Sequence, residues 1–328
     1  MTKTNNHRPV SVLAAGLLST VPAVHVQAFD WAGTVWQNDF FTGTDGGGYT
    51  NGLFLSLYDL SDQGDEPYKV PLLAKPLQWM LQPSADAVMF SERSLGQGMS
   101  TPKDISRPVP DPKDAPYAGL LIYRSSHAIV EKDFADMVST TIGIVGPASG
   151  AEKSQELVHK ITGSDKPQGW DYQLGNEFLF QLERTAVWRF ALHERIDSVL
   201  LAQAGVGNLE STVGGGAIVR IGQGLEKSFA TTALHFGRIS MPLAVEGGWY
   251  VYGGLEVDYV FNNILINGNT YRDSPSSDLE HEQLSGTLGF SYSWDNISLA
   301  LSYKTGTALD VNKSSRDSFG AISVAWRL

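Results

Sequence analysis

Apolar and polar residues alternate along much of the chain after its first 28 residues. In the segment "GYTNGLFLSLYDL" (48–60), Leu53, Leu55 and Leu57 fall on one face of an extended strand, and Gly52 and Ser56 fall on the other. Alternation with a period of two residues predicts β-strands that meet different surroundings on their two faces. In a barrel that crosses a membrane, those surroundings are lipid and lumen.

Twelve segments show this pattern. They are residues 31–38, 48–60, 88–97, 117–129, 137–145, 177–192, 198–207, 214–222, 249–261, 284–294, 297–303 and 319–328. Aromatic residues stand at many segment ends, as they do in the two girdles of an outer-membrane barrel. We therefore expect an all-β fold, a single transmembrane antiparallel β-barrel of about 12 strands; a soluble β-sandwich is the alternative.

The joints between these segments differ in length. Asp295 and Asn296 stand between two alternating runs and suit a two-residue hairpin turn. The connections 62–76 and 100–116 are long and rich in proline. Short turns on one side of the barrel and long loops on the other are typical of outer-membrane barrels.

The beginning of the chain predicts export. Lys3 and Arg8 precede an apolar run at residues 10–24, and small residues end at Ala28, which is the pattern of a cleavable signal peptide. We expect a signal peptide at 1–28 and a barrel catalytic domain at 29–328, located in the outer membrane of a Gram-negative cell. A membrane anchor is the alternative, but the run is shorter than a spanning helix needs.

Composition removes several function classes. The chain has no cysteine, which excludes disulfides, thiolate zinc sites and a cysteine nucleophile. Its net charge of -11 argues against a nucleic-acid partner, because phosphate binding requires a basic face. The same charge is compatible with the binding of divalent cations.

One segment has a helical pattern within this strand-rich chain. In "SGAEKSQELVHKITG" (149–163), Ser149 and Glu152 have the spacing of a capping box, and Gly163 suits the end of a helix. Gln155 and His159 are four residues apart and so share one face. We expect a short helix here, in a loop on the extracellular side.

A carboxylate follows this helix closely. Asp165 lies six residues after His159. A lone histidine is most often structural or on the surface, but a histidine beside a carboxylate can be oriented for proton transfer or can adjoin a metal ion. The other histidines after residue 28 are scattered singly, which predicts structural or surface roles: His127, His193, His235 and His281.

Four blocks of sequence resemble the outer-membrane lipid A 3-O-deacylase family. They are "WQNDFFTGTDGGGYTNG" (36–52), "GQGMSTPKDI" (96–105), "PYAGLLIY" (116–123) and "GIVGPASGAEKSQELVHKITGSDKPQGWDYQLGNE" (143–177). The likeness extends over nearly the whole chain after residue 28, in the same order. It implies a calcium-dependent, twelve-stranded barrel that removes the ester-linked acyl chain at the 3-position of lipid A.

The resemblance also implies a set of site residues. They are Asn38, Asp39, Thr50, His159 and Asp165. One branch of the family carries glutamate at the last of these positions, so Asp165 is shorter by one methylene. The implied partners are lipid A within lipopolysaccharide and the outer-membrane lipids, with the protein as a monomer.

The chemistry of ester hydrolysis gives each residue a role. A neutral imidazole can take a proton from water near pH 7, so His159 is the expected general base. Asp39 and Asp165 are the expected metal ligands for Ca²⁺, although their oxygen atoms also suit other hard cations. Asn38 would supply an amide oxygen or orient the substrate, and Thr50 would contribute a hydroxyl group.

Strand parity suggests where two of these residues meet. Asn38 belongs to the set of Thr34 and Trp36, and Thr50 belongs to the set of Gly52 and Ser56. If both sets face inward, Asn38 and Thr50 meet at the top of the lumen. Two other functions stay open, a phospholipase of the same membrane and a porin-like barrel without catalysis.

Overall fold

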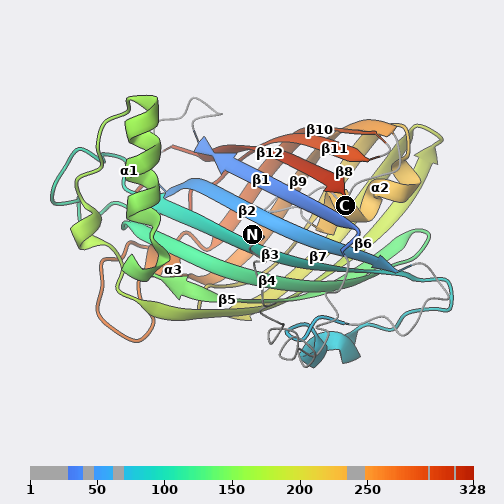
Figure 1. Cartoon of the computed structure of the whole chain (residues 1–328), viewed down its shortest axis with the longest axis horizontal. Helices are drawn as coiled ribbons and strands as arrows, with labels where there is room; N and C mark the ends of the chain where they lie inside the picture. The colour runs from blue at the N-terminus through green and yellow to red at the C-terminus, as the bar shows by residue number, and fades with distance from the viewer. Residues whose placement is uncertain (1–28, 40–47, 62–69, 235–247, 295, 314) are drawn as a thin grey trace, which may run out of the picture.

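The computed structural model describes residues 29–39, 48–61, 70–234, 248–294, 296–313 and 315–328. The expected signal peptide, residues 1–28, lies outside them. Twelve strands close into one barrel in which each strand pairs with its neighbours in sequence and the first pairs with the last (Figure 1). All of these pairings are antiparallel. The predicted fold is confirmed.

Each of the twelve predicted segments corresponds to one strand. The strands are β1 (Trp31–Asn38), β2 (Gly48–Ser61), β3 (Val88–Thr101), β4 (Ala118–Val130), β5 (Phe134–Val145), β6 (Glu177–His193), β7 (Ile196–Gly207), β8 (Glu210–Gly222), β9 (Gly248–Asn263), β10 (Glu282–Ser293), β11 (Ile297–Gly306) and β12 (Asp317–Arg327).

Short helices occur in the connections. They are α1 (Ala151–Thr162), α2 (Leu225–Leu234), α3 (Ile264–Asn267) and the 3-10 turns η2 (Lys75–Met80), η3 (Pro147–Ser149) and η4 (Trp170–Tyr172). No helix in the described ranges has the length and apolar character needed to cross a membrane.

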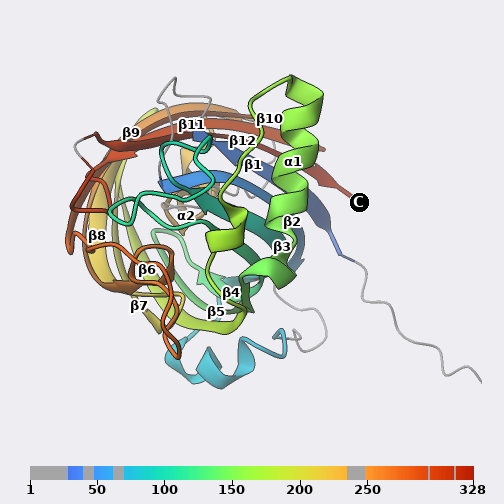
Figure 2. The same ribbon diagram turned by 90° about the vertical axis from the view of Figure 1, so that its left-hand side faces the viewer.

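The two ends of the barrel are distinguished by what they carry. Trp31 pairs with Arg327, so the first and last strands begin and finish at the same end, which we call the terminal end. The opposite end, the loop end, carries α1 (Figures 1 and 2). The connection 100–116 lies at the loop end, but residues 70–87 and helix α2 lie at the terminal end. The expectation that long loops occur on one side only is therefore wrong.

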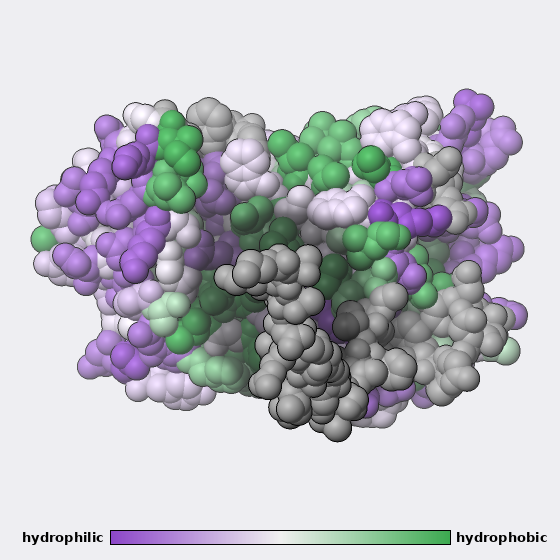
Figure 3. Space-filling model, viewed as in Figure 1, coloured by the Kyte–Doolittle hydropathy of each residue, from purple (hydrophilic) through white to green (hydrophobic). Residues whose placement is uncertain are grey.

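The alternation predicted from the sequence separates the two faces of the wall. On β2, Leu53 and Leu55 are 52% and 57% exposed, whereas Phe54 and Ser56 are each 3% exposed. The exposed residues form an apolar belt around the outside, visible as a band between hydrophilic ends (Figure 3). At the predicted hairpin, the Trp294 N–H donates to the Ile297 carbonyl over 2.7 Å. Asp295 lies outside the described residues.

Helix α2 lies inside the barrel near its terminal end (Figure 2). Phe229 and Ala230 of α2 pack against a cluster of inward-facing wall residues: Phe90, Ala128, Ala135, Met137, Val187, Val199, Leu201 and Ile218. Burial of these apolar side chains holds the helix in the lumen. The lumen is therefore filled at this end.

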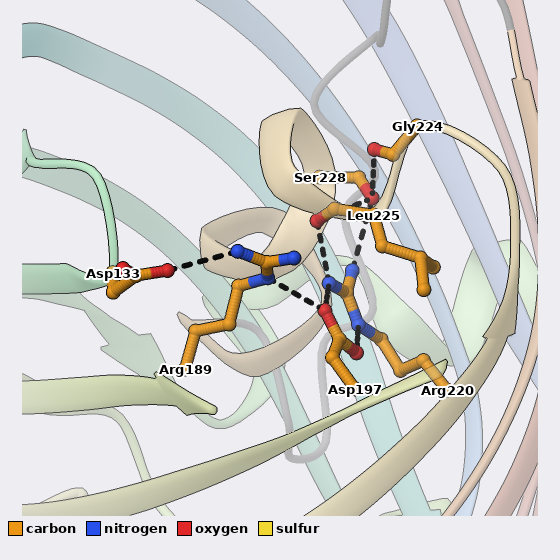
Figure 4. Close-up of polar contacts among 7 residues, drawn as sticks. All are labelled: Asp133, Arg189, Asp197, Arg220, Gly224, Leu225 and Ser228. Carbon is orange, nitrogen blue, oxygen red and sulfur yellow. Dashed lines mark hydrogen bonds and ion pairs between the residues drawn. The ribbon is translucent and has the colours of Figure 1, made fainter. Parts of the chain in front are cut away.

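A buried ion-pair network joins α2 to the wall (Figure 4). The Arg220 guanidinium lies 2.6 Å from Asp197, and neither side chain is exposed. Arg220 also donates to the Leu225 carbonyl and to the Ser228 hydroxyl on α2. Asp197 accepts a further bond from Arg189. Paired in this way, the buried charges fix α2 in one position.

A second segment covers the same part of the wall from the outside. Residues 70–87, which we call the outer cover, include η2 and lie beside β3–β5. Leu81 and Ala87 pack with Ile129 and Val138 of the wall. The Thr140 hydroxyl donates to the Leu73 carbonyl over 2.7 Å. Both faces of this wall region are thus buried, which explains why alternation weakens there.

Candidate functional site

Helix α1 begins at Ala151, one residue later than it would if Ser149 were the N-cap. Gly150 occupies the N-cap position with φ 72°, a left-handed conformation that glycine adopts without strain. Ser149 ends the preceding 3-10 turn, and its hydroxyl accepts the Ala151 N–H over 3.4 Å. The predicted capping box is therefore wrong. The predicted stop at Gly163, with φ 74°, is confirmed.

The start of α1 packs on the outer face of the wall. Ala151 and Trp170 join Met99 and Tyr117 in one buried cluster. Met99 shares the outward parity of Leu95, which is 52% exposed. A Cβ at Gly119 would lie 2.4 Å from the Ala151 Cβ, so glycine is required for this close approach.

One face of α1 is fixed by a buried hydrogen bond. The indole nitrogen of Trp170 donates to Gln155 Oε1 over 2.7 Å, and Gln155 is 4% exposed. From this anchor the helix crosses the loop-end edges of β4, β3, β2 and β1 (Figures 1 and 2). Leu157 and Ile161 are exposed, so they lie on the other side of the helix.

His159 lies one turn after Gln155 on the anchored face and is half-buried. Its Nδ1 atom is 2.5 Å from the backbone carbonyl oxygen of Asp165. A carbonyl oxygen can only accept, so Nδ1 carries the proton and a neutral imidazole has its lone pair on Nε2. This tautomer suits a general base. The contact with Asp165 uses its backbone, while its side chain is exposed.

Asn38 does not face the lumen. It ends β1, where Val35 and Gln37 are 1% and 0% exposed and Trp36 is 45% exposed. Because side chains alternate along a strand, Asn38 has the outward parity of Trp36. The inward position beside it belongs to Gln37, which accepts a hydrogen bond from the Tyr49 hydroxyl. The expected meeting of Asn38 and Thr50 at the top of the lumen is therefore wrong.

Thr50 departs from the parity of its strand because of a β-bulge. The register between β2 and β3 shifts between Tyr49 and Asn51. The Thr50 hydroxyl lies 2.9 Å from that of Thr101 and also donates to the Gly48 carbonyl. Since Thr101 shares the outward parity of Met99, this pair of hydroxyls lies at the outer edge of the wall.

The predicted site residues are thus distributed over three elements and the connections that follow two of them. Asn38 and Thr50 lie at the loop-end edges of β1 and β2, and His159 lies on the helix that crosses those edges. Asp39 directly follows β1 and borders the mouth of the lumen. Among the described residues, no three His, Asp or Glu side chains gather into a metal-binding group.

Sequence reasoning missed several residues of this region. Thr101 and Met99 lie in the block "GQGMSTPKDI", and Trp170 lies in the long block around His159. These residues therefore lie inside the sequence blocks that carry the family resemblance. The bond of Thr101 to Thr50 depends on strand register, and the bond of Trp170 to Gln155 depends on helix rotation. No local pattern specifies either.

Two ionisable groups near α1 have shifted pKa values. Burial raises the pKa of the Tyr117 phenol to about 12. The hydrogen bond to Glu156, at 3.0 Å, raises the pKa of Lys166 above its usual value. Lys166 therefore stays positively charged next to Asp165.

The lumen holds a cavity of about 520 Å³, which Asp39 borders and which several charged side chains line. Lys304 lies 2.5 Å from Glu256, and Arg124 lies 3.2 Å from Glu183. Gln203 donates to Glu256 and also to Asp258. These side chains largely satisfy one another, and none of them belongs to the predicted site.

Comparisons with known proteins agree with this architecture. Among solved structures, LpxR from Salmonella typhimurium matches with a TM-score of 0.72 and 17% identity, covering 91% of this chain and 100% of that chain. The β domain of the Bordetella autotransporter BrkA matches with a TM-score of 0.43 and 10% identity, covering 92% and 99%. The second likeness is too weak to support an argument. No curated protein sequence matches the chain.

The family model decides the classification. The model described as "Outer membrane protein LpxR" matches residues 11–328, which is nearly the whole chain. The resemblance found in the four sequence blocks is thereby confirmed, and so is the outer membrane as the location. The chain belongs to the LpxR family of outer membrane proteins.

Proposed function

We propose that the protein is a hydrolase that removes the ester-linked acyl chain at the 3-position of lipid A. The observation that carries this proposal is the contact between His159 Nδ1 and the Asp165 carbonyl, which gives the imidazole a tautomer suited to a base. Membership of the LpxR family supports the substrate class.

The position of the site also favours a membrane lipid as substrate. Asn38 and Thr50 lie at the outer edge of the wall, next to the apolar belt rather than in the lumen. A lipid can therefore approach from the bilayer without entering the barrel. With α1 on the side that we infer to be extracellular, this lipid lies in the leaflet that contains lipopolysaccharide.

The residues around the site suit a hard cation. The candidate ligands are oxygen atoms, from the Asp39 and Asp165 carboxylates, the Asn38 amide and the Thr50 hydroxyl, and such ligands fit Ca²⁺. Few carboxylates contribute, so water and substrate oxygens would complete the coordination. When bound, the cation would stabilise negative charge on the ester carbonyl oxygen.

The protein residues then account for the proton transfers. His159 Nε2 takes a proton from water while the water oxygen forms a bond to the ester carbonyl carbon. When the bond to the sugar oxygen breaks, the imidazolium returns the proton to that oxygen. The products are a free acyl chain as its carboxylic acid, which then loses its proton to the solvent, and lipid A with a 3-hydroxyl group. The Asp165 carbonyl stabilises the imidazolium by continuing to accept from Nδ1.

The test is mass spectrometry of lipid A after incubation with purified protein and Ca²⁺. We expect release of a 3-hydroxyacyl chain or an acyloxyacyl unit. His159→Ala should abolish release and leave the barrel folded, as judged by heat-modifiable migration on gels. The matched control is Lys160→Ala, because Lys160 directly follows His159 on the helix and is exposed. An unchanged lipid A mass with the wild-type protein would refute the proposal.

The two other functions make different predictions. A phospholipase would release acyl chains from phospholipid when both lipids are offered together. A porin would conduct ions without hydrolysis, but α2 fills the terminal end of the lumen and opposes this function. The proposed partners remain lipopolysaccharide and outer-membrane lipids, with the protein acting as a monomer.

A further inference from the structure

The apolar belt on the outside of the barrel is interrupted over β3–β5. Near the loop end, one outward row across β2–β6 is almost wholly apolar: Leu55, Leu95, Tyr123, Ile142 and Phe180. The next two rows toward the terminal end contain many polar residues: Leu57, Arg93, Ser125, Thr140 and Leu182, then Asp59, Ser91, His127, Val138 and Arg184.

Such rows are unsuited to contact with acyl chains. Polar groups within a bilayer are costly unless they are paired or shielded. Ser91, Ser125 and His127 are each at most 2% exposed, although all three have outward parity. The Ser125 hydroxyl has no hydrogen-bond partner among the described residues. Something on the outside must therefore cover them.

The outer cover supplies this shield. Its residues Leu81 and Ala87 pack on Ile129 and Val138, and the Leu73 carbonyl accepts from Thr140. Ala74 is completely buried. The cover lies outside the barrel, along the wall near its terminal end (Figures 1 and 2). Here the cover, rather than the strands, forms the outer surface.

The outward surface of the cover is itself apolar at two positions. Leu72 and Trp79 are 77% and 76% exposed. The belt continues on either side, with Leu57 exposed on β2, and Trp188 and Phe190 exposed on β6. Leu72 and Trp79 therefore present apolar side chains over the wall region where the polar rows interrupt the belt. The same cover also exposes polar side chains, including Lys75 and Gln78.

We infer that the outer cover is a lipid-binding surface, and that Leu72 and Trp79 insert into the leaflet at the terminal end of the barrel. The occupant is the acyl region of glycerophospholipids. Tryptophan suits this depth because its ring is amphipathic. The inference does not depend on the proposed deacylase activity.

The absence of cysteine allows a direct test. Single-cysteine variants Trp79→Cys and Leu72→Cys are spin-labelled in vesicles of phosphatidylethanolamine and phosphatidylglycerol. Collision rates with oxygen and with a water-soluble nickel chelate are then measured. Leu55→Cys in the belt is the lipid control, and Tyr271→Cys, 77% exposed in the connection between β9 and β10, is the aqueous control. Heat-modifiable migration confirms that each variant is folded.

We expect both cover labels to match the Leu55 label, with high oxygen access and nickel access several-fold below that of the Tyr271 label. Nickel access equal to that of the Tyr271 label at both positions would overturn the inference. Dipolar broadening that disappears on dilution with unlabelled protein would also overturn it, because the occupant would then be a second copy of the chain.

Discussion

The Trp170 indole donates to Gln155, one helical turn before His159 on the same face of α1. Both partners of this bond are buried beside the outer wall. The rotation of the helix about its axis is therefore fixed, and with it the direction of the imidazole. This hydrogen bond can in this way control the placement of His159, the proposed general base.

Replacement of Gln155 by leucine should reduce deacylation more than it reduces substrate binding. Leucine leaves the Trp170 N–H buried without its acceptor, which costs about 1–3 kcal/mol. We expect kcat to fall and KM to change little, because the altered group positions His159 only. Rates measured over a range of lipid A concentrations provide the check. Leu157→Gln, on the exposed side, is the control, and an unchanged kcat in Gln155→Leu would contradict this role.

Substitution of Asp165 can separate its backbone role from its proposed role as a ligand. The carbonyl that contacts His159 belongs to the main chain, so Asp165→Ala retains it. If the carboxylate also binds Ca²⁺, the variant should need a higher calcium concentration for half-maximal activity while keeping much of its maximal rate. Activity is measured in calcium-buffered solutions.

Two comparisons show whether the Asp165 carboxylate binds calcium. Asp165→Glu should restore the calcium dependence, since it restores a carboxylate. An Asp165→Ala variant with wild-type calcium dependence would exclude the carboxylate as a ligand. Loss of all activity at saturating calcium would show instead that the loop no longer supports His159.

Alkaline pH should loosen the attachment of α1 through Tyr117. Burial favours the neutral phenol and raises its pKa in the folded protein to about 12, above the value of about 10 in an unfolded chain. The stabilising contribution is therefore complete below pH 10 and is lost as the pH rises through 12. Absorbance of phenolate near 295 nm should show a late ionisation step that is missing in Tyr117→Phe. A difference spectrum that titrates near pH 10 would contradict the prediction.

The sequence predicted the barrel more fully than the site. Alternation at Leu53, Leu55 and Leu57 specified a strand, because lipid and lumen select different residues on its two faces. Parity grouped Asn38 with Trp36 correctly, but it could not state which set faces lipid. The aromatic residue Trp36, which is exposed in the structure, was the sequence signal that this set faces lipid.

Other features lay beyond local patterns. The bulge at Thr50 shifts the strand by one residue, and it arises from pairing with β3, which is distant in sequence. Ser149 is a residue type that often caps helices. Gly150 nevertheless occupies the N-cap position of α1, because the chain turns sharply after η3. Neither α2 in the lumen nor the outer cover was predicted, since both depend on the closed barrel for their contacts.

The buried pair of Arg220 and Asp197 should keep the lumen closed at its terminal end. Arg220→Ala leaves Asp197 with Arg189 as its remaining cationic partner and removes the bonds to Leu225 and Ser228 on α2. Removal of one member of a buried ion pair costs about 3–5 kcal/mol, so α2 should leave its position in part of the population. Ionic conductance across planar bilayers should then rise above that of the wild-type protein.

The control is Arg195→Ala, which removes an exposed arginine from the turn between β6 and β7. Its conductance should equal that of the wild type, because Arg195 takes no part in the network of Figure 4. Heat-modifiable migration must show a folded barrel for both variants. If Arg220→Ala is folded and still does not conduct, the apolar contacts of Phe229 and Ala230 are sufficient to hold α2 in the lumen, and the ion pair is not the element that closes it.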